Sequence, residues 1–187
     1  MIGKVLHLVS MILVWTVAAA PWIAYAQHPP SREFQIKAAF LYNFTKFIEW
    51  PAEAFPEGEA RLIICALGES PVGVALQYIK DKPVKGRTLI TKRLQSVREL
   101  RSCHLVFVSS TEKDRLSEIF ESLKDSSVLT VGEMEGFIQS GGIINFIIRK
   151  NRIRFEINPD AAGQAGLKIS SNLLKLATVV RPRRRGE

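Results

Sequence analysis

The chain contains only two cysteines and three histidines among 187 residues, and this scarcity excludes several kinds of site. A structural zinc centre takes about four Cys or His ligands in closely spaced pairs, and the sequence has no such cluster. A thiol oxidoreductase needs Cys-x-x-Cys and a serine hydrolase needs Gly-x-Ser-x-Gly, and neither motif occurs. The nucleotide-binding glycine motifs are also missing. We therefore predict no metal site, no cofactor and no enzymatic activity.

Two weaker chemical signals also favour a structural interpretation. Residues 68–73 lie between an apolar run and a helical one, where a phosphate could rest on helix-end amides, but Glu69 would repel the phosphate and Pro71 removes a donor. His104 adjoins Cys103, yet neighbouring residues on a strand point to opposite faces. We therefore do not expect these two side chains to share a metal or to act as base and nucleophile.

The N-terminus has the three parts of an export signal. Lys4 supplies a basic start, residues 5–20 are almost wholly apolar, and Ala24-Tyr-Ala26 offers the small-x-small pattern that signal peptidase cleaves. The apolar stretch is shorter than the roughly 20 residues of a membrane-spanning helix, and an uncleaved anchor is the rival interpretation. We expect a signal peptide over residues 1–26, cleavage after Ala26, and a single mature domain over residues 27–180 in the periplasm.

The interpretation of the two cysteines depends on whether the chain is exported. Cys65 and Cys103 each lie in a short apolar run, residues 62–67 and 103–108, that is typical of a strand. In the reducing cytosol such thiols would be inert core residues. In an oxidising compartment, two thiols with no other partner are a candidate disulfide. Bridging would require Cα atoms within about 7 Å, as on adjacent strands.

Positive charge is in excess and is concentrated at the C-terminus. The formal net charge is +8, and Lys4 is the one charged residue that cleavage would remove. The tail over residues 181–187 contains Arg181, Arg183, Arg184 and Arg185. A solvated, disordered tail is the simplest interpretation, and contact with anionic lipid is the alternative. Nucleic acid is not an expected partner of an exported protein.

Short apolar runs alternate with helical stretches along the chain. We expect helices over residues 31–49, 71–80, 109–124 and 171–179, with a helical turn over 96–100 and another helical region from Pro159. The expected strands are residues 62–67, 88–92, 103–108, 128–131, 143–148 and 152–158. This order predicts an α/β fold in which helices cover both faces of a mostly parallel sheet. The last two strands would form an antiparallel hairpin at its edge.

Two surfaces have the composition of a binding site. On the first helix, Ile36, Phe40 and Phe47 widen the apolar stripe beyond what a surface helix usually buries. A crowded core could use the whole stripe, or this second face could meet a partner or a second copy of the chain. On the last strand, Arg154 and Glu156 alternate with apolar residues, which predicts either a solvated sheet face or a docking ladder.

Five blocks of sequence extend in order across the mature chain. They are Lys37-Ala-Ala-Phe-Leu-Tyr-Asn-Phe-Thr-Lys-Phe-Ile-Glu-Trp-Pro51, Gly86-Arg87, Arg154-Phe-Glu-Ile-Asn158, Ala165-Gly-Leu-Lys-Ile-Ser-Ser171 and Leu173-Leu-Lys-Leu-Ala177. Together these blocks resemble the YfiR family of exported proteins. The resemblance implies a Rossmann-like three-layer sandwich without a nucleotide site. It also implies a periplasmic repressor that holds an inner-membrane diguanylate cyclase inactive, and so restrains cyclic-di-GMP signalling and biofilm formation.

The resemblance also assigns roles to particular residues. It implies that Cys65 and Cys103 match a family cysteine pair that can form a disulfide. A second pair, which some members carry nearer the C-terminal hairpin, has no counterpart here. The partner-facing region would map to the strand containing Glu156 and to the stretch of Leu167, Lys168 and Ile169. A different class of function, a periplasmic small-molecule-binding module that reports to a membrane sensor kinase, is the alternative, with a crevice near Gly68 and Ser109.

Overall fold

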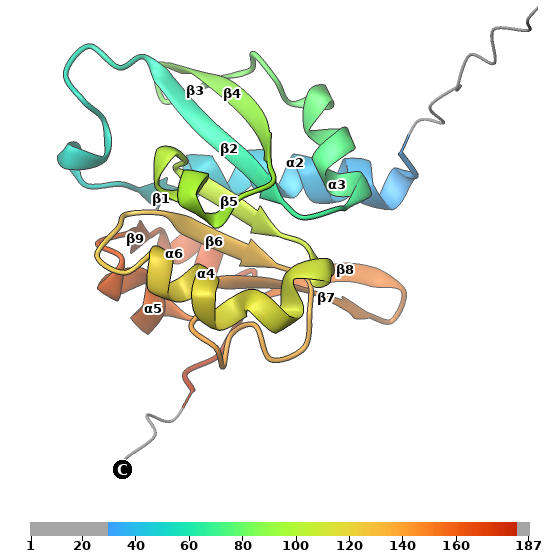
Figure 1. The fold of residues 1–187 in the computed structure, drawn as a ribbon. Helices are drawn as coiled ribbons and strands as arrows, with labels where there is room; N and C mark the ends of the chain where they lie inside the picture. The colour runs from blue at the N-terminus through green and yellow to red at the C-terminus, as the bar shows by residue number, and fades with distance from the viewer. Residues whose placement is uncertain (1–29, 183–187) are drawn as a thin grey trace, which may run out of the picture.

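The computed structural model describes residues 30–182, and Figure 1 shows their arrangement. The expected signal peptide, residues 1–26, and residues 183–187 of the basic tail lie outside the described residues. Among residues 30–182, no helix combines the length and the apolar character needed to cross a membrane.

An eight-stranded mixed sheet organises the chain, with the strand order β10-β8-β7-β6-β5-β2-β4-β3. Five strands run parallel: β2 (Arg61–Leu67), β4 (Arg87–Leu94), β5 (Leu105–Val108), β6 (Leu129–Gly132) and β7 (Ile144–Arg149). At the two ends, β3 (Pro83–Val84) and β8 (Arg152–Ile157) are antiparallel to their neighbours, and β10 (Thr178–Val179) is parallel to β8. The sheet curls into a half-barrel with helices around it (Figure 1). The predicted α/β fold is therefore confirmed.

Helices cover the two faces of the sheet in separate layers. On one face lie α2 (Arg32–Phe47), α3 (Pro71–Ala75) with the 3₁₀ turn η2 (Leu76–Tyr78), and α6 (Ser171–Leu174). On the other lie the 3₁₀ helix η3 (Val97–Ser102) and α4 (Leu116–Ser122), which follows η4 (Ser110–Arg115). The remaining helical segments are η1 (Ala52–Ala54) and α5 (Pro159–Gln164). This arrangement is the expected three-layer sandwich.

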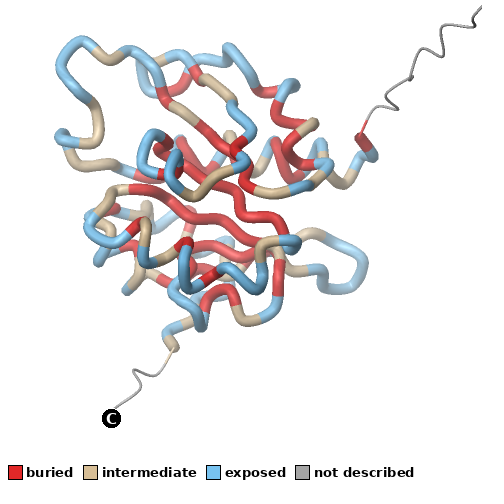
Figure 2. Tube along the Cα trace, in the orientation of Figure 1, coloured by how far each residue is buried: buried red, intermediate tan, exposed pale blue. Residues whose placement is uncertain are grey.

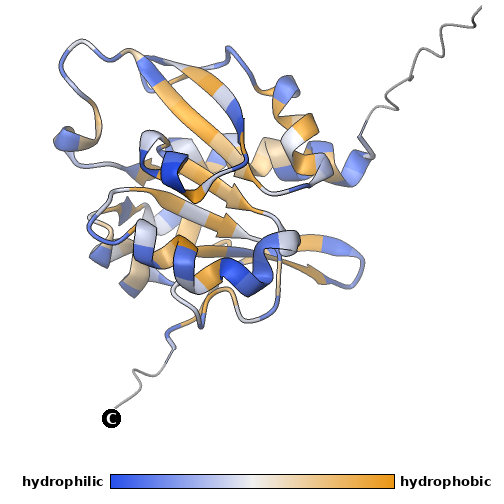
Figure 3. Cartoon of the chain, viewed as in Figure 1, coloured by the Kyte–Doolittle hydropathy of each residue, from blue (hydrophilic) through white to orange (hydrophobic). Residues whose placement is uncertain are grey.

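Alternation along the central strands explains why both layers are needed. On β5, Leu105 and Phe107 pack toward α2 and α3, whereas Val106 and Val108 pack toward α4. All four side chains are fully buried. Figure 2 shows the central strands as largely buried, and Figure 3 shows them as largely hydrophobic. A strand buried on both faces must carry an unbroken apolar run, as the sequence of this strand does.

The structure corrects three of the expected element boundaries. Helix α2 ends at Phe47 rather than Glu49, because the next two residues become extended as β1 (Ile48–Glu49) and pair with β9 (Lys168–Ile169). The helix expected over residues 109–124 begins as the 3₁₀ helix η4 and becomes α-helical only at Leu116. The helix expected over residues 171–179 stops at Leu174.

The third correction also changes the edge of the sheet. The β-branched residues Thr178 and Val179 form β10 instead of helix, and they pair with Glu156 and Ile157 of β8. β10 therefore covers the C-terminal end of β8, and the hairpin forms the edge of the sheet only near its tip. The tip itself is as expected, because Lys150 and Asn151 have positive φ angles of 50° and 57° and form a two-residue turn.

The two cysteines form a disulfide, as the sequence suggested. Cys65 lies on β2 and Cys103 lies two residues before β5, its neighbour in the sheet, and their Cα atoms are 6.1 Å apart. Both residues are buried on the α4 face. The bond joins positions 38 residues apart in sequence and therefore closes a long loop around η3 and β4.

Replacing both cysteines with alanine should lower the free energy of unfolding by about 3–4 kcal/mol, because the unfolded chain regains the entropy of that loop. Urea unfolding of the exported protein in non-reducing buffer measures the difference. The wild-type protein unfolded with a reductant is the control, and its stability should approach that of the double variant. Two free thiols in the mass spectrum of the non-reduced protein would contradict the pairing.

Candidate partner-binding surface

The C-terminal half of α2 packs against the C-terminal hairpin through aromatic side chains. Phe40 lies 6.0 Å from Phe146 of β7 and 5.8 Å from Phe155 of β8, measured between ring centroids. Phe44, one turn further along, lies 5.8 Å and 5.1 Å from the same two rings. Because Phe44 is fully buried and Phe40 is half-buried, the aromatic cluster runs from the core to the surface.

Beyond this cluster the apolar surface continues into solvent. Ile148 is paired with Ile153 across the hairpin, two positions closer to the tip than Phe146 and Phe155, so both lie on the same sheet face as those rings. Ile148 is 63% exposed, and Ile36, one turn before Phe40 on α2, is 39% exposed. Figures 2 and 3 show the hairpin projecting from the body, with apolar residues along its arms and exposed residues near its tip. We call Ile36, Phe40, Ile148 and Ile153 the α2–hairpin surface.

The structure does not bring all of the sequence-predicted binding residues to this surface. Arg154 and Glu156 alternate with Phe155 and so lie on the opposite face of the sheet. Arg154 is exposed, and Glu156 is half-buried beside β10. Ile148 was not among the expected residues, although its exposed place near a hairpin turn follows from the sequence pattern once the turn is located.

The other predicted residues meet at the far end of α2. Ile169 pairs with Ile48 and Lys168 with Glu49 in the small β1–β9 ladder, and the Ser170 N–H donates to the carbonyl of Phe47 at 2.9 Å. Phe47 and Ile169 are half-buried and Lys168 is exposed. Leu167 is 4% exposed and belongs to the core, so it supports this ladder and offers no surface of its own.

A buried lysine fixes α2 to the carboxyl ends of the parallel strands. The Lys37 ammonium group lies 2.6 Å from a Glu33 carboxylate oxygen and 2.8 Å from one of Glu133, which follows β6. Burial lowers the pKa of Lys37, but its hydrogen bonds with Glu133 and Glu33 raise the pKa by more. The pKa of Lys37 therefore lies above its ordinary value. Lys37 is therefore charged at any physiological pH, and the ion pairs hold the helix beside the hairpin.

At the opposite ends of these strands, His104 is enclosed by aromatic and backbone groups. Its ring stacks on Phe55 at 4.4 Å, and the guanidinium of Arg87 lies 3.8 Å from the centroid of the same Phe55 ring. Nδ1 accepts a hydrogen bond from the Ile63 N–H at 3.0 Å, so the proton of the neutral ring is on Nε2, 3.0 Å from the Ala54 carbonyl. Burial chiefly lowers the pKa of His104 below its ordinary value of 6.5.

This arrangement confirms that the side chains of Cys103 and His104 point to opposite faces of the sheet. Cys103 packs with the α4 layer, whereas His104 stacks on Phe55, which packs with the α2 layer. The Trp50 indole N–H also donates to the His104 carbonyl at 3.2 Å. Trp50 and Arg87 belong to two separate sequence blocks of the family resemblance, and the fold brings both to this cluster. Within residues 30–182, no group of three or more His, Cys, Asp or Glu side chains is placed to bind a metal ion.

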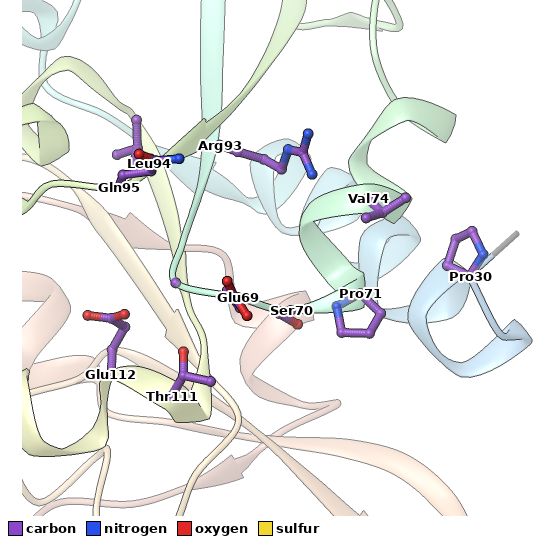
Figure 4. Close-up of a pocket in the computed structure, with 11 residues that line it drawn as sticks. Pro30, Glu69, Ser70, Pro71, Val74, Arg93, Leu94, Gln95, Thr111 and Glu112 are labelled. Carbon is purple, nitrogen blue, oxygen red and sulfur yellow. The ribbon is translucent and has the colours of Figure 1, made fainter. Parts of the chain in front are cut away.

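A cleft of about 1000 Å³ lies at the carboxyl ends of β2 and β4, where the sequence suggested a crevice. Its polar lining comes from Glu69 and Ser70 after β2, Arg93 on β4, and Thr111 and Glu112 of η4. Figure 4 shows Arg93 extending toward α3, whereas Thr111 and Glu112 come from the opposite wall. The cleft is open and of mixed polarity, and it is large enough for a small polar metabolite.

The described residues define a doubly covered α/β domain with one disulfide, an open cleft and an exposed apolar surface on a projecting hairpin. A family model described as YfiR/HmsC-like matches residues 34–178, and the chain belongs to this family. The resemblance found in the sequence blocks is thereby confirmed.

Two solved structures resemble part of the fold. One is the ABC domain in complex with L-Trp from Streptococcus pneumonia, which is 16% identical with a TM-score of 0.47 and matches 64% of this chain and 55% of its own. The other is a conserved domain protein from Vibrio cholerae O1 biovar El Tor, which is 10% identical with a TM-score of 0.46 and matches 78% of this chain and 59% of its own. This chain therefore spans less than two thirds of either protein.

The enclosed histidine should make stability depend on pH. Because the pKa of His104 is lower in the folded state than in the unfolded chain, its contribution to stability is complete above about pH 6.5 and is lost as pH falls through the folded value. His104→Gln can keep both backbone hydrogen bonds but cannot titrate. In urea unfolding between pH 5 and pH 8, the wild-type protein should lose more stability on acidification than His104→Gln. Parallel pH profiles would contradict a buried neutral histidine.

Proposed function

We propose that this chain is a non-enzymatic periplasmic regulator that binds the periplasmic segment of an inner-membrane diguanylate cyclase and holds the enzyme inactive. By lowering cyclic-di-GMP, it would restrain biofilm formation. The observation that carries the proposal is the match of residues 34–178 to the YfiR/HmsC-like family. The export signal expected from the N-terminal sequence supports a periplasmic site of action.

The α2–hairpin surface supports binding to a protein. Ile36 lies one turn from Phe40 on α2 and Ile148 lies two positions beyond Phe146 on β7, and exposed apolar side chains gathered in this way mark interaction sites. The surface is also well supported from below, because Lys37 fixes the helix and the paired rings of Phe146 and Phe155 fix the hairpin. A rigid surface costs less entropy to bind than a mobile one.

Repression needs more than contact with the cyclase. The regulator must bind the inactive conformation of the cyclase more tightly than the active one, because a ligand with equal affinity for both states shifts no equilibrium. A tenfold preference corresponds to about 1.4 kcal/mol. This is within reach of one buried isoleucine, whose full burial contributes about 1.5–3 kcal/mol.

A second candidate function is the binding of a small molecule and the reporting of it to a membrane sensor kinase. The observation that favours it is the cleft of about 1000 Å³ at the carboxyl ends of β2 and β4. Ligands of open α/β sheets bind at this end of the strands. Arg93 would attract an anionic group of the ligand, whereas Glu69 and Glu112 would attract a cationic one. Ser70 and Thr111 would supply hydroxyl groups.

Deleting the gene should raise cellular cyclic-di-GMP, and complementation with Ile148→Glu should fail to lower it again, because a buried charge would weaken docking of the α2–hairpin surface. Leu176→Glu is the matched control, since Leu176 is 67% exposed but belongs to the turn after α6. Cyclic-di-GMP is measured by mass spectrometry and export of each variant by immunoblot. An unchanged cyclic-di-GMP level after deletion would contradict the proposal that the target is a cyclase. If Ile148→Glu still lowered cyclic-di-GMP, the α2–hairpin surface would not be the binding site.

If the cleft binds a metabolite, a thermal-shift screen should find compounds that raise the melting temperature of the wild-type protein. Val74→Trp would fill part of the cleft from α3 and should abolish the shift. Ile148→Glu is the control variant and should keep it, because the hairpin does not line the cleft. A screen in which no metabolite raises the melting temperature would count against the sensor function.

A further inference from the structure

We propose that the outer edge of β4 accepts an extended acidic segment of a partner protein as an added strand. Seven residues of β4 pair with β2 on the inner side, from Thr88 to Leu94. On the outer side, β3 covers only the beginning of the strand, opposite Arg87 and Thr88. The second half of a long strand therefore lies at an edge that no other described strand covers.

The hydrogen bonds at the covered end show which backbone groups point outward. Leu89 donates its N–H to the Lys82 carbonyl at 3.0 Å and accepts from the Asp81 N–H at 2.9 Å, both beyond the outer edge. The direction alternates along a strand, so Thr91 and Arg93 also direct their N–H and C=O groups outward. No hydrogen bond to another residue of 30–182 satisfies the N–H of Thr91 or of Arg93. Such a row of free donors and acceptors is a template for strand addition.

Space for the added strand lies beside the same residues. A hollow of about 240 Å³ is bordered by Thr91, Lys92 and Arg93 of β4. Its other wall is formed by Val74 of α3, Gln77 of η2 and Lys80, which follows η2. Three of its wall residues, Gly73, Val74 and Leu76, are small or aliphatic and the others are polar. Alternate side chains of an added strand would enter this hollow, while the intervening ones would face solvent.

The charge around the outer edge of β4 indicates which kind of segment would bind there. Lys92 and Arg93 are exposed on the edge strand itself, and Lys80 and Lys82 are exposed beside it, whereas Asp81 is the one acidic residue in that connection. A segment rich in Glu or Asp would complement these cations. A second copy of the chain pairing edge to edge would instead bring Lys92 and Arg93 close to their own equivalents, which is unfavourable. The surface therefore fits an acidic partner strand better than a second copy.

Basic residues on an edge strand can also serve only to prevent aggregation, and the experiment separates the two roles. Protein purified from the periplasm and labelled with ¹⁵N is titrated with the acetylated, amidated peptide Val-Glu-Val-Glu-Thr-Glu-Val. The control peptide replaces each Glu with Lys. Binding of the acidic peptide should be saturable and should slow amide hydrogen exchange at Thr91 and Arg93 by about tenfold or more, because both amides gain a partner. The basic peptide should do neither.

Thr91→Pro removes one outward N–H, and Thr91→Ala is the matched control that retains it. We expect Thr91→Pro to abolish binding of the acidic peptide, Thr91→Ala to keep it within about twofold, and Lys92→Glu to weaken it. Equal binding of both peptides, or saturation without protection of Thr91 and Arg93, would overturn the inference even if Thr91→Pro failed to fold. A dimer that Thr91→Pro dissociates in sedimentation would assign the edge to a second copy. The inference does not rest on the proposed cyclase, so loss of repression in Ile148→Glu and loss of peptide binding in Thr91→Pro are separate results.

Discussion

The central strands β2 and β5 carry apolar side chains on both faces, so they can be buried only if two separate helical layers cover them. Helix α2 provides most of one layer through Ala38, Leu41 and Phe44, and α4 provides the other through Leu116 and Ile119. Burial of this kind contributes about 25 cal/mol for each Å² of apolar surface removed from water. The exposed features arise where this coverage ends, at the tip of the hairpin and at the outer edge of β4.

Each layer is fixed by a different kind of interaction. On the α2 face, a charged lysine between two glutamates holds the helix, and the removal of either partner would leave charge in a poorly solvated place. On the α4 face, the covalent bond between Cys65 and Cys103 joins the start of β5 to β2. Beneath the α4 layer, β2 and β5 are thus joined by a disulfide, which forms only under oxidising conditions. The α2 layer is held in addition by the ion pairs of Lys37.

The sequence predicts the layers well and the ends of elements poorly. Continuous apolar runs such as residues 103–108 define buried strands, and the spacing of Leu116, Ile119 and Leu123 defines the buried face of α4. By contrast, β1, β3, β9 and β10 each have two residues and no periodicity to detect. Their existence depends on partners distant in the chain, as Ile48 depends on Ile169. The candidate surface was found only in part for the same reason, because the sequence locates Ile36 and Phe40 on a helix but not the contact of Phe40 with the hairpin.

The peptide bond between Cys103 and His104 joins a side chain under the α4 layer to one on the α2 side. One side chain is tied covalently to β2 under the α4 layer, and the other stacks on Phe55 and bonds to Ile63 and Ala54 on the opposite side. A displacement of either side chain must be absorbed by the same short backbone segment at the start of β5. At the periplasmic site proposed for this chain, acidity would act on His104 and oxidants or reductants on Cys103. Two features of the external medium would therefore act on the same two-residue segment that precedes β5.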